Sequence, residues 1–294
     1  MQVKSMIKKI ISGICAILLC LAGCAYFWWT QNEARLKDEY AAYRKTGAPI
    51  LMYHAICSRE GKESWPESLI LNPQLFEEHM KYLKEQGYQI ISVEDLAKRL
   101  TEGANVEKCV ALTFDDGYLD NYTIAMPIMK KYDAKGTFFV INQDINKPDK
   151  MGDKEIFGLL AEGMELGSHT TSHAPLAKID PKFLAWELST SRFYLKKNYN
   201  RYIVRTLAYP NGGYNDNVIA KAQEYGFYRA VTGHIGLNTY DTFKKAPMEM
   251  YRVTVADDGN GLEGFKNRLE QAYFYGFLQT KGIDINIIRD IFVK

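Results

Sequence analysis

Short apolar runs alternate with helix-like segments from residue 49 to about residue 232, and this alternation constrains the fold more than any other feature of the chain. The expected strands lie at Pro49–Tyr53, Tyr88–Ile91, Val110–Phe114 and near residues 137–141, 164–168, 205–208 and 229–232. The expected helices begin at Asn72-Pro73 and at Ser92, and lie near residues 120–131, 153–162, 181–198 and 215–225. Strands that alternate with helices predict parallel βαβ units, and therefore an α/β fold.

Three clusters of polar residues follow expected strands, at residues 115–118, 169–173 and 209–214. In α/β folds, ligands bind at the carboxyl ends of the parallel strands. The three clusters are therefore the first places to look for a functional site.

The first cluster places two carboxylates side by side, Asp115 and Asp116, directly after the strand Val110–Phe114. Adjacent carboxylates next to a buried strand repel each other unless a positive group lies nearby. A metal ion bound by one of them would resolve the conflict and leave the other free to act as a base. An ordinary Asp-Asp-Gly turn explains the same residues equally well.

The second cluster holds two of the five histidines in the chain, His169 and His173. Two histidines four residues apart can share one face of a helical turn and bind one metal ion. Together with one aspartate they would make a His₂–carboxylate set that leaves positions open for water and substrate. Such a set accepts zinc, cobalt or nickel with similar geometry.

The three clusters together resemble the polysaccharide deacetylase family, also called carbohydrate esterase family 4 or the NodB homology domain. Thr113–Gly117 is similar to the family's first motif, TFDDG, and His169–His173 is similar to its second, H-[ST]-x-x-H. Tyr209–Gly212 resembles the third motif, although turn chemistry alone also explains its proline and glycines. The resemblance covers roughly residues 48–255 and implies a distorted (β/α)₇ barrel.

The resemblance also implies a role for each matched position. Asp115 would be the base that takes a proton from the attacking water, and a metal, usually zinc, would be held by Asp116, His169 and His173. The substrate and its oxyanion would face Tyr209, Pro210 and Asn211. Asn211 stands where the family has an aromatic residue, so the backbone donor is kept and an aromatic wall is lost.

The general acid departs from the family pattern, because no histidine follows His234 and the late Leu-x-His motif is therefore missing. His54 follows the first expected strand and is favoured as the acid, with His234, which follows the strand near residues 229–232, as the alternative. Arg252 is expected either to orient Asp115 or to be an exposed strand-edge arginine.

Two segments are most similar to the branch of the family that contains exported poly-N-acetylglucosamine deacetylases, Leu51–His54 and Tyr251–Val255. The expected activity is therefore removal of N-acetyl groups from an extracellular or cell-wall polysaccharide. Two alternatives stay open: an esterase for O-acetyl groups such as those of xylan, and a cell-wall binding protein without catalysis. A net charge of +2, from 37 basic and 35 acidic residues, gives no indication of a nucleic-acid partner.

The N-terminal segment predicts a membrane anchor over residues 1–30. Lys4, Lys8 and Lys9 precede an apolar run from Ile10 to Trp29, long enough at about 1.5 Å per residue to cross a bilayer core of roughly 30 Å. Lysines on this side stay in the cytoplasm, which places the rest of the chain outside.

The alternative to an uncleaved anchor is a lipoprotein, because Leu21–Cys24 matches a lipobox. Residues 31–47 are expected to form a helical stalk, and residues 48–294 the deacetylase-like domain.

Overall fold

The computed structural model describes residues 19–20, 22–24, 27, 30–199 and 205–287, and it divides the chain into two units, residues 1–43 and 44–294. In the first unit, residues 30–43 are helical and overlap most of the predicted stalk, residues 31–47. The predicted anchor, Ile10–Trp29, lies largely outside the described residues and stays a prediction. No helix among the described residues is long and apolar enough to cross a membrane.

The second unit is built on a parallel sheet. Its eight strands are β2 (Ile50–Tyr53), β5 (Gln89–Ile91), β6 (Cys109–Phe114), β7 (Thr137–Val140), β8 (Glu165–Ser168), β9 (Thr206–Ala208), β10 (Arg229–Val231) and β12 (Val253–Thr254). They lie in the order β10-β9-β8-β7-β6-β2-β12, and β5 pairs with the first half of β6. All seven strands expected from the sequence are present, within one or two residues of the predicted bounds.

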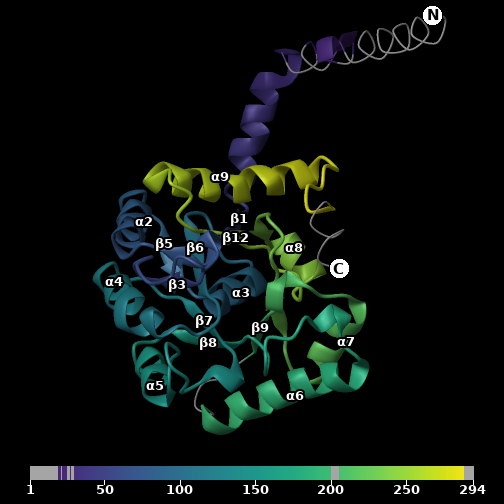
Figure 1. Ribbon diagram of the computed structural model, residues 1–294. Helices are drawn as coiled ribbons and strands as arrows, with labels where there is room; N and C mark the ends of the chain where they lie inside the picture. The colour runs from purple at the N-terminus through teal and green to yellow at the C-terminus, as the bar shows by residue number, and fades with distance from the viewer. Residues whose placement is uncertain (1–18, 21, 25–26, 28–29, 200–204, 288–294) are drawn as a thin grey trace, which may run out of the picture. The chain divides into compact units, whose positions relative to one another are not determined.

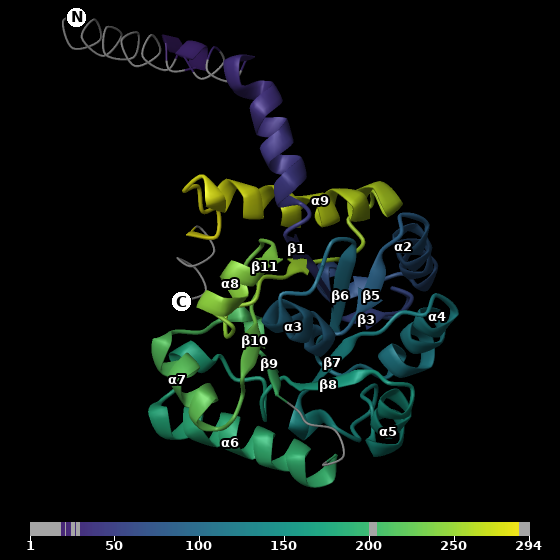
Figure 2. The same cartoon turned by 180° about the vertical axis from the view of Figure 1, so that it is seen from behind.

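The sheet curls round on itself, because the segment 250–254 contacts β10 at one end of the sheet and pairs with β2 near the other. Met250 forms a parallel bridge with Val231 of β10, and Val253 pairs with Leu51 of β2. Figures 1 and 2 show the strands from the front and from behind, with helices around them. This curled parallel sheet fits the barrel of the NodB type that the resemblance implies.

The helices among the described residues are α2 (Pro73–Glu85), α3 (Val93–Glu102), α4 (Met126–Lys131), α5 (Asp153–Ala161), α6 (Pro181–Asn198), α7 (Asp216–Glu224), α8 (Tyr240–Lys245) and α9 (Gly261–Thr280). Two of them, α2 and α3, begin at the predicted caps. The side chain of Asn72 accepts a hydrogen bond from the Gln74 amide, and that of Ser92 accepts one from the Asp95 amide. These acceptors satisfy amides that a helix leaves unpaired in its first turn.

The structure adds elements that the sequence pattern does not reveal. The segment expected as one helix near 120–131 begins with a π-helical turn, Asn121–Ala125. Four two-residue strands and one short helix are also present: β1 (Gly47–Ala48), β3 (Ala55–Ile56), β4 (Ile70–Leu71), β11 (Asn238–Thr239) and α8. Elements this short span too few residues to produce a periodic pattern, and tertiary contacts decide their conformation.

His79 of α2 is a buried histidine that lies between α9 and strand β2. Its ring stacks on Phe265 of α9 at 3.9 Å between centroids, and its Nδ1 lies 3.4 Å from the Tyr53 hydroxyl. Burial lowers the pKa of His79 to about 3, so the folded protein holds this imidazole neutral.

We expect His79 to make the folded state less stable as the pH falls. Between about pH 6.5 and pH 3 the unfolded chain binds a proton that the folded chain does not, so stability decreases with falling pH in this window. At one pH unit below the unfolded pKa, the loss is roughly 1 kcal/mol. His79→Phe keeps the ring contact and should flatten this part of the profile, measured by urea unfolding between pH 7.5 and 5. An equally steep profile in the variant would exclude His79 as the cause.

Candidate active site

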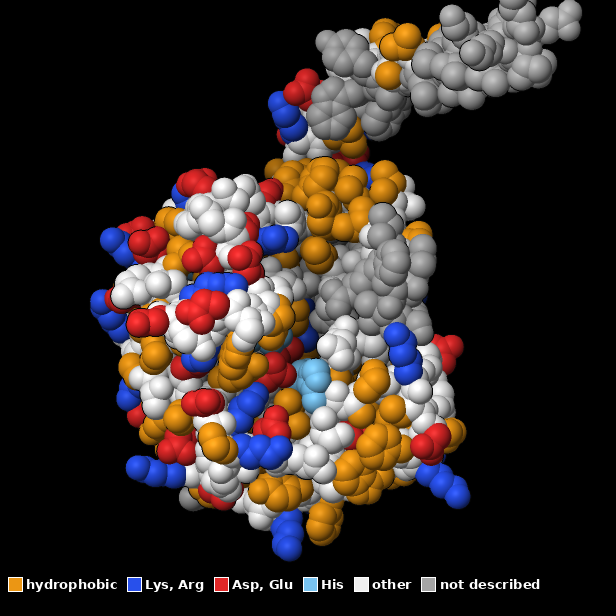
Figure 3. Space-filling view, in the orientation of Figure 1, with side chains coloured by type: hydrophobic (Ala, Val, Ile, Leu, Met, Phe, Trp, Pro, Cys, Tyr) orange, Lys and Arg blue, Asp and Glu red, His pale blue; other side chains and the backbone are white. Residues whose placement is uncertain are grey.

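Strand ends bring the candidate residues to one cavity. Tyr53 of β2 pairs with Phe114 of β6, so the next residues, His54 and Asp115, emerge side by side. A cavity of about 270 Å³ opens there. It is lined by Met52, His54, Leu69, Asp115, Asp116, His169, His173, Tyr209, Asn211, Gly212, Gly233 and Arg252. On the face shown in Figure 3, histidine surface lies beside acidic side chains.

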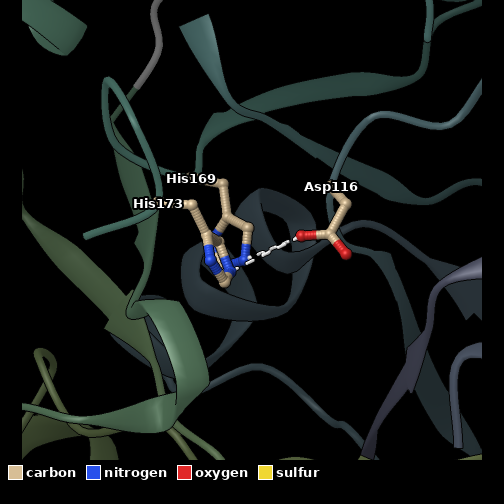
Figure 4. Close-up of side chains that lie close together, drawn as sticks. All are labelled: Asp116, His169 and His173. Carbon is tan, nitrogen blue, oxygen red and sulfur yellow. Dashed lines mark ion pairs between the residues drawn. The ribbon is translucent and has the colours of Figure 1, made fainter. Parts of the chain in front are cut away.

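Three side chains converge in the cavity as metal ligands would. Oδ1 of Asp116 lies 3.4 Å from Nε2 of His169 and 3.6 Å from Nε2 of His173 (Figure 4). One donor atom from each of the three residues lies within 4.8 Å of the others. Two imidazole nitrogens and one carboxylate oxygen are donors that zinc and similar divalent metals accept.

The surroundings of His169 suit a metal ligand. Its Nδ1 lies 2.9 Å from the carbonyl oxygen of Ala208, an acceptor that fixes the proton on Nδ1 and leaves the Nε2 lone pair facing Asp116. Burial lowers the pKa of His169, and the nearby carboxylates of Asp115 and Asp116 oppose this shift without cancelling it. A neutral imidazole is the form that binds a metal.

The two histidines are not on a helical turn, and in this respect the prediction is wrong. Residues 169–175 form a loop, in which Thr170 and His173 adopt left-handed backbone angles with φ of 69° and 63°. Asp116 and Asn211 of the same cavity also have positive φ, at 70° and 55°. Such conformations cost of order 1–3 kcal/mol each and persist only where the surroundings fix them, so this site is held under backbone strain.

Asp115 is held by a buried ion pair. Nη1 of Arg252 donates to Oδ1 of Asp115 at 2.7 Å, and Nε of Arg252 donates to the carbonyl of Thr232 at 2.8 Å. Both side chains of the pair are about 2% exposed, so the alternative of an exposed strand-edge arginine is wrong. Burial alone would raise the pKa of Asp115, but Arg252, and after it His169, hold this pKa at about 2.

His54 faces the same cavity with a ring nitrogen unused. Its Nδ1 is buried and has no hydrogen-bond partner among the described residues. Its backbone carbonyl accepts a hydrogen bond from Nδ2 of Asn121 at 2.8 Å. Burial lowers the pKa of His54, and the charges of Asp115 and Asp116 oppose the shift.

Comparison with known proteins agrees with this geometry. The sequence model of the polysaccharide deacetylase family matches residues 102–230. The Bacillus subtilis protein YxkH, which carries the family's name, is 32% identical over 230 residues that cover 76% of this chain and 78% of YxkH. The chain belongs to the polysaccharide deacetylase family. As a polysaccharide deacetylase it is a hydrolase that acts on N-acetyl groups.

Solved structures of other deacetylases share the fold. The Streptococcus pyogenes deacetylase PplD, in complex with acetate, superposes with a TM-score of 0.69 at 30% identity, covering 76% of this chain and 99% of PplD. Among the sequence relatives, a poly-beta-1,6-N-acetyl-D-glucosamine N-deacetylase of Staphylococcus epidermidis is 25% identical over 222 residues, 66% of this chain and 76% of that protein.

The structure separates the two histidines that the sequence offers as a general acid. His234 lies on a different cavity of about 330 Å³, where its Nδ1 is 3.3 Å from the Tyr214 hydroxyl. Of the two, only His54 lines the cavity of this deacetylase that holds Asp115 and the three candidate ligands.

The third motif contributes to the cavity wall. Tyr209 and Asn211 line it, whereas Pro210 is buried and is absent from the lining. The Tyr209 hydroxyl donates to the Met248 carbonyl at 3.1 Å, which fixes the ring.

Two residues that shape the deacetylase site were missed from the sequence. Nζ of Lys150 donates to the carbonyl of Asp116 at 2.8 Å and lies 3.7 Å from the centre of the Tyr118 ring. Glu187 of α6 is fully buried beside the histidine loop. A signal for Glu187 existed, since it falls on the apolar stripe of α6 with Leu184 and Leu188. No comparable pattern marks Lys150, which lies in an irregular segment.

Proposed function

We propose that this chain is a metal-dependent deacetylase, attached to the membrane outside the cytoplasm, that removes N-acetyl groups from a polymer of N-acetylglucosamine. One observation carries the proposal. A carboxylate kept ionised by a buried arginine, Asp115, stands beside a His₂–carboxylate donor set in the same cavity. A base next to a set of metal donors is an arrangement that supports metal-assisted hydrolysis of an acetamide.

The residues divide the reaction between them. A divalent metal, when bound, would polarise the acetyl carbonyl and make water more acidic. Asp115 accepts the proton of the water whose oxygen attacks the carbonyl carbon. His54 donates a proton to the sugar nitrogen as the C–N bond breaks, which releases acetate and a free amine. The backbone N–H of Asn211 would donate to the oxyanion.

The choice of metal and polymer rests on chemistry and on relatives. Zinc fits the two imidazoles and one carboxylate, and cobalt or nickel would fit similarly. Relatives in Staphylococcus are named for poly-beta-1,6-N-acetyl-D-glucosamine, which supports that polymer, with peptidoglycan N-acetylglucosamine as a second candidate. The location rests on the predicted anchor over residues 1–30, in which three lysines precede the apolar run.

The substrate class and the acid can be tested in one experiment. The full-length chain would be assayed for acetate release from poly-N-acetylglucosamine oligomers and from acetylated xylan, with His54→Ala alongside. We expect release from the N-acetyl substrate, and a loss of about 10²-fold in kcat for the variant, because an amine leaves only after protonation. If the chain also hydrolyses the O-acetyl groups of xylan, His54→Ala should lower that kcat much less than the kcat for N-acetyl groups, since an alcohol is a better leaving group than an amine.

His234→Ala is the matched control and should keep kcat within a few-fold. Release from xylan alone would favour the O-acetyl esterase. A loss in His234→Ala but not in His54→Ala would move the role of general acid to His234.

A further inference from the structure

Glu187 is a buried carboxylate whose hydrogen bonds all go to the histidine loop. Its Oε2 accepts from the backbone N–H of Thr171 at 2.9 Å and of Ser172 at 3.0 Å. Its Oε1 accepts from the Ser172 hydroxyl, and its backbone carbonyl accepts from the Thr171 hydroxyl at 2.9 Å. No basic side chain among the described residues pairs with Glu187, so the loop itself compensates this buried charge.

The loop is folded around this carboxylate. Thr170 adopts φ of 69°, and the two amides that follow it both point at one oxygen of Glu187. Successive N–H groups next to a left-handed residue form a concave anion site, which here is filled from α6. On the other side, the loop carbonyls of Thr170 and Thr171 accept from the amides of Asn142 and Gln143 after β7.

Of the three candidate ligands, His173 depends most on the loop. The His169 ring is fixed by the Ala208 carbonyl, and the backbone of Asp116 is held by Lys150. For the His173 ring, the described residues offer no acceptor of that kind, and its φ of 63° is set by the loop. The His173 amide donates to the Thr170 hydroxyl at 3.1 Å, and the His173 ring packs edge-on against the His169 ring, so the conformation of residues 170–173 directs the His173 Nε2 toward Asp116.

We propose that Glu187 is a positioning residue for the metal: it fixes the loop 170–173 so that both imidazoles reach one ion, and its charge favours a cation there. This inference rests on the proposed metal site. It adds a fourth residue to the determinants of metal affinity, one that does not touch the metal or the substrate.

Zinc affinity tests the proposal directly. Metal-free full-length chain would be titrated with ZnCl₂ by calorimetry, as the unaltered protein and as Glu187→Gln. Gln keeps the size of Glu187 but loses the charge and turns one acceptor into a donor. We expect zinc to bind about 10- to 100-fold more weakly, as is typical when a group that orients a ligand is changed. At saturating zinc, KM for the oligomer should be unchanged.

Glu165→Gln is the matched control. Glu165 is a half-buried carboxylate that likewise accepts from two hydroxyls and an amide, those of Thr137, Thr206 and Glu94, but it lies at the amino end of β8, opposite the site. The Glu165→Gln substitution should lower the melting temperature and leave the zinc affinity within about twofold of that of the unaltered chain. Cobalt-loaded protein gives a second readout, because its visible spectrum reports ligand geometry and should change only in Glu187→Gln.

Ser172→Ala is a milder substitution, to be used if the Glu187→Gln variant does not fold. It removes one hydrogen-bond donor, the Ser172 hydroxyl, from the Glu187 carboxylate. It should weaken zinc binding several-fold. Unchanged zinc affinity in a folded Glu187→Gln, or in Ser172→Ala if the first variant is unfolded, would overturn the inference. Failure of the unaltered chain to bind zinc would instead overturn the proposed metal site, so the two failures are distinguishable.

Discussion

Asp115→Asn is expected to lower kcat by about 10²- to 10⁴-fold while zinc affinity stays within a few-fold of that of the unaltered chain. Asparagine has nearly the same shape and keeps an oxygen for the Arg252 guanidinium, so the cavity should persist. It cannot take the proton of the attacking water. The measurement is steady-state acetate release from N-acetylglucosamine oligomers at saturating zinc, with calorimetry for the metal.

Asp180→Asn is the matched control for this substitution. Asp180 caps α6 by accepting from the amides of Lys182 and Phe183, outside the cavity, and asparagine caps a helix equally well. Its kcat should be unchanged. If Asp115→Asn kept more than about a tenth of the activity, the assignment of Asp115 as the general base would be wrong.

Arg252→Met is expected to cost about 3–5 kcal/mol of folding stability, the largest effect on stability that we predict. The substitution leaves the buried Asp115 carboxylate without its cation and frees the Thr232 carbonyl that Arg252 also bonds. Methionine fills similar volume, so the loss reports the charge rather than a cavity. Urea unfolding at neutral pH measures it.

A double-mutant cycle separates the pair from its surroundings. In Arg252→Met combined with Asp115→Asn no unpaired charge is left, so the combined cost should be smaller than the sum of the two single costs by about 1–3 kcal/mol. Strictly additive costs would show that the ion pair contributes nothing beyond its two separate side chains. Activity should be lost in the single Arg252 variant as well, because Asp115 would no longer be held toward the cavity.

Much of the fold could be predicted from the sequence because its elements are long enough to be periodic. The strand Val110–Phe114 and the helix capped by Asn72 are found as expected, since a buried apolar run and a capping signal are local properties. The curl of the sheet was implied by the family resemblance, and the alternation of strands and helices does not show it by itself. It depends on the pairing of Met250 and Val253 with strands far away in sequence, which no local pattern encodes.

The residues of the candidate site could be predicted from the sequence, but part of their geometry could not. The motifs named the residues, and the structure brings Asp116, His169 and His173 together. The path of the chain between the histidines was predicted wrongly, because a spacing of four residues fits both a helical turn and a loop that is held by Glu187. Burial of Arg252 against Asp115 likewise arises only from tertiary packing.

We infer that this deacetylase needs a metal bound by Asp116, His169 and His173. The most direct test is acetate release by the full-length chain after its metal has been removed with dipicolinate, and again after zinc is added back. We predict that activity falls to background, returns with one equivalent of zinc, and does not return in His173→Ala. Full activity in protein from which no metal can be detected by atomic absorption would show that the reaction does not need the metal.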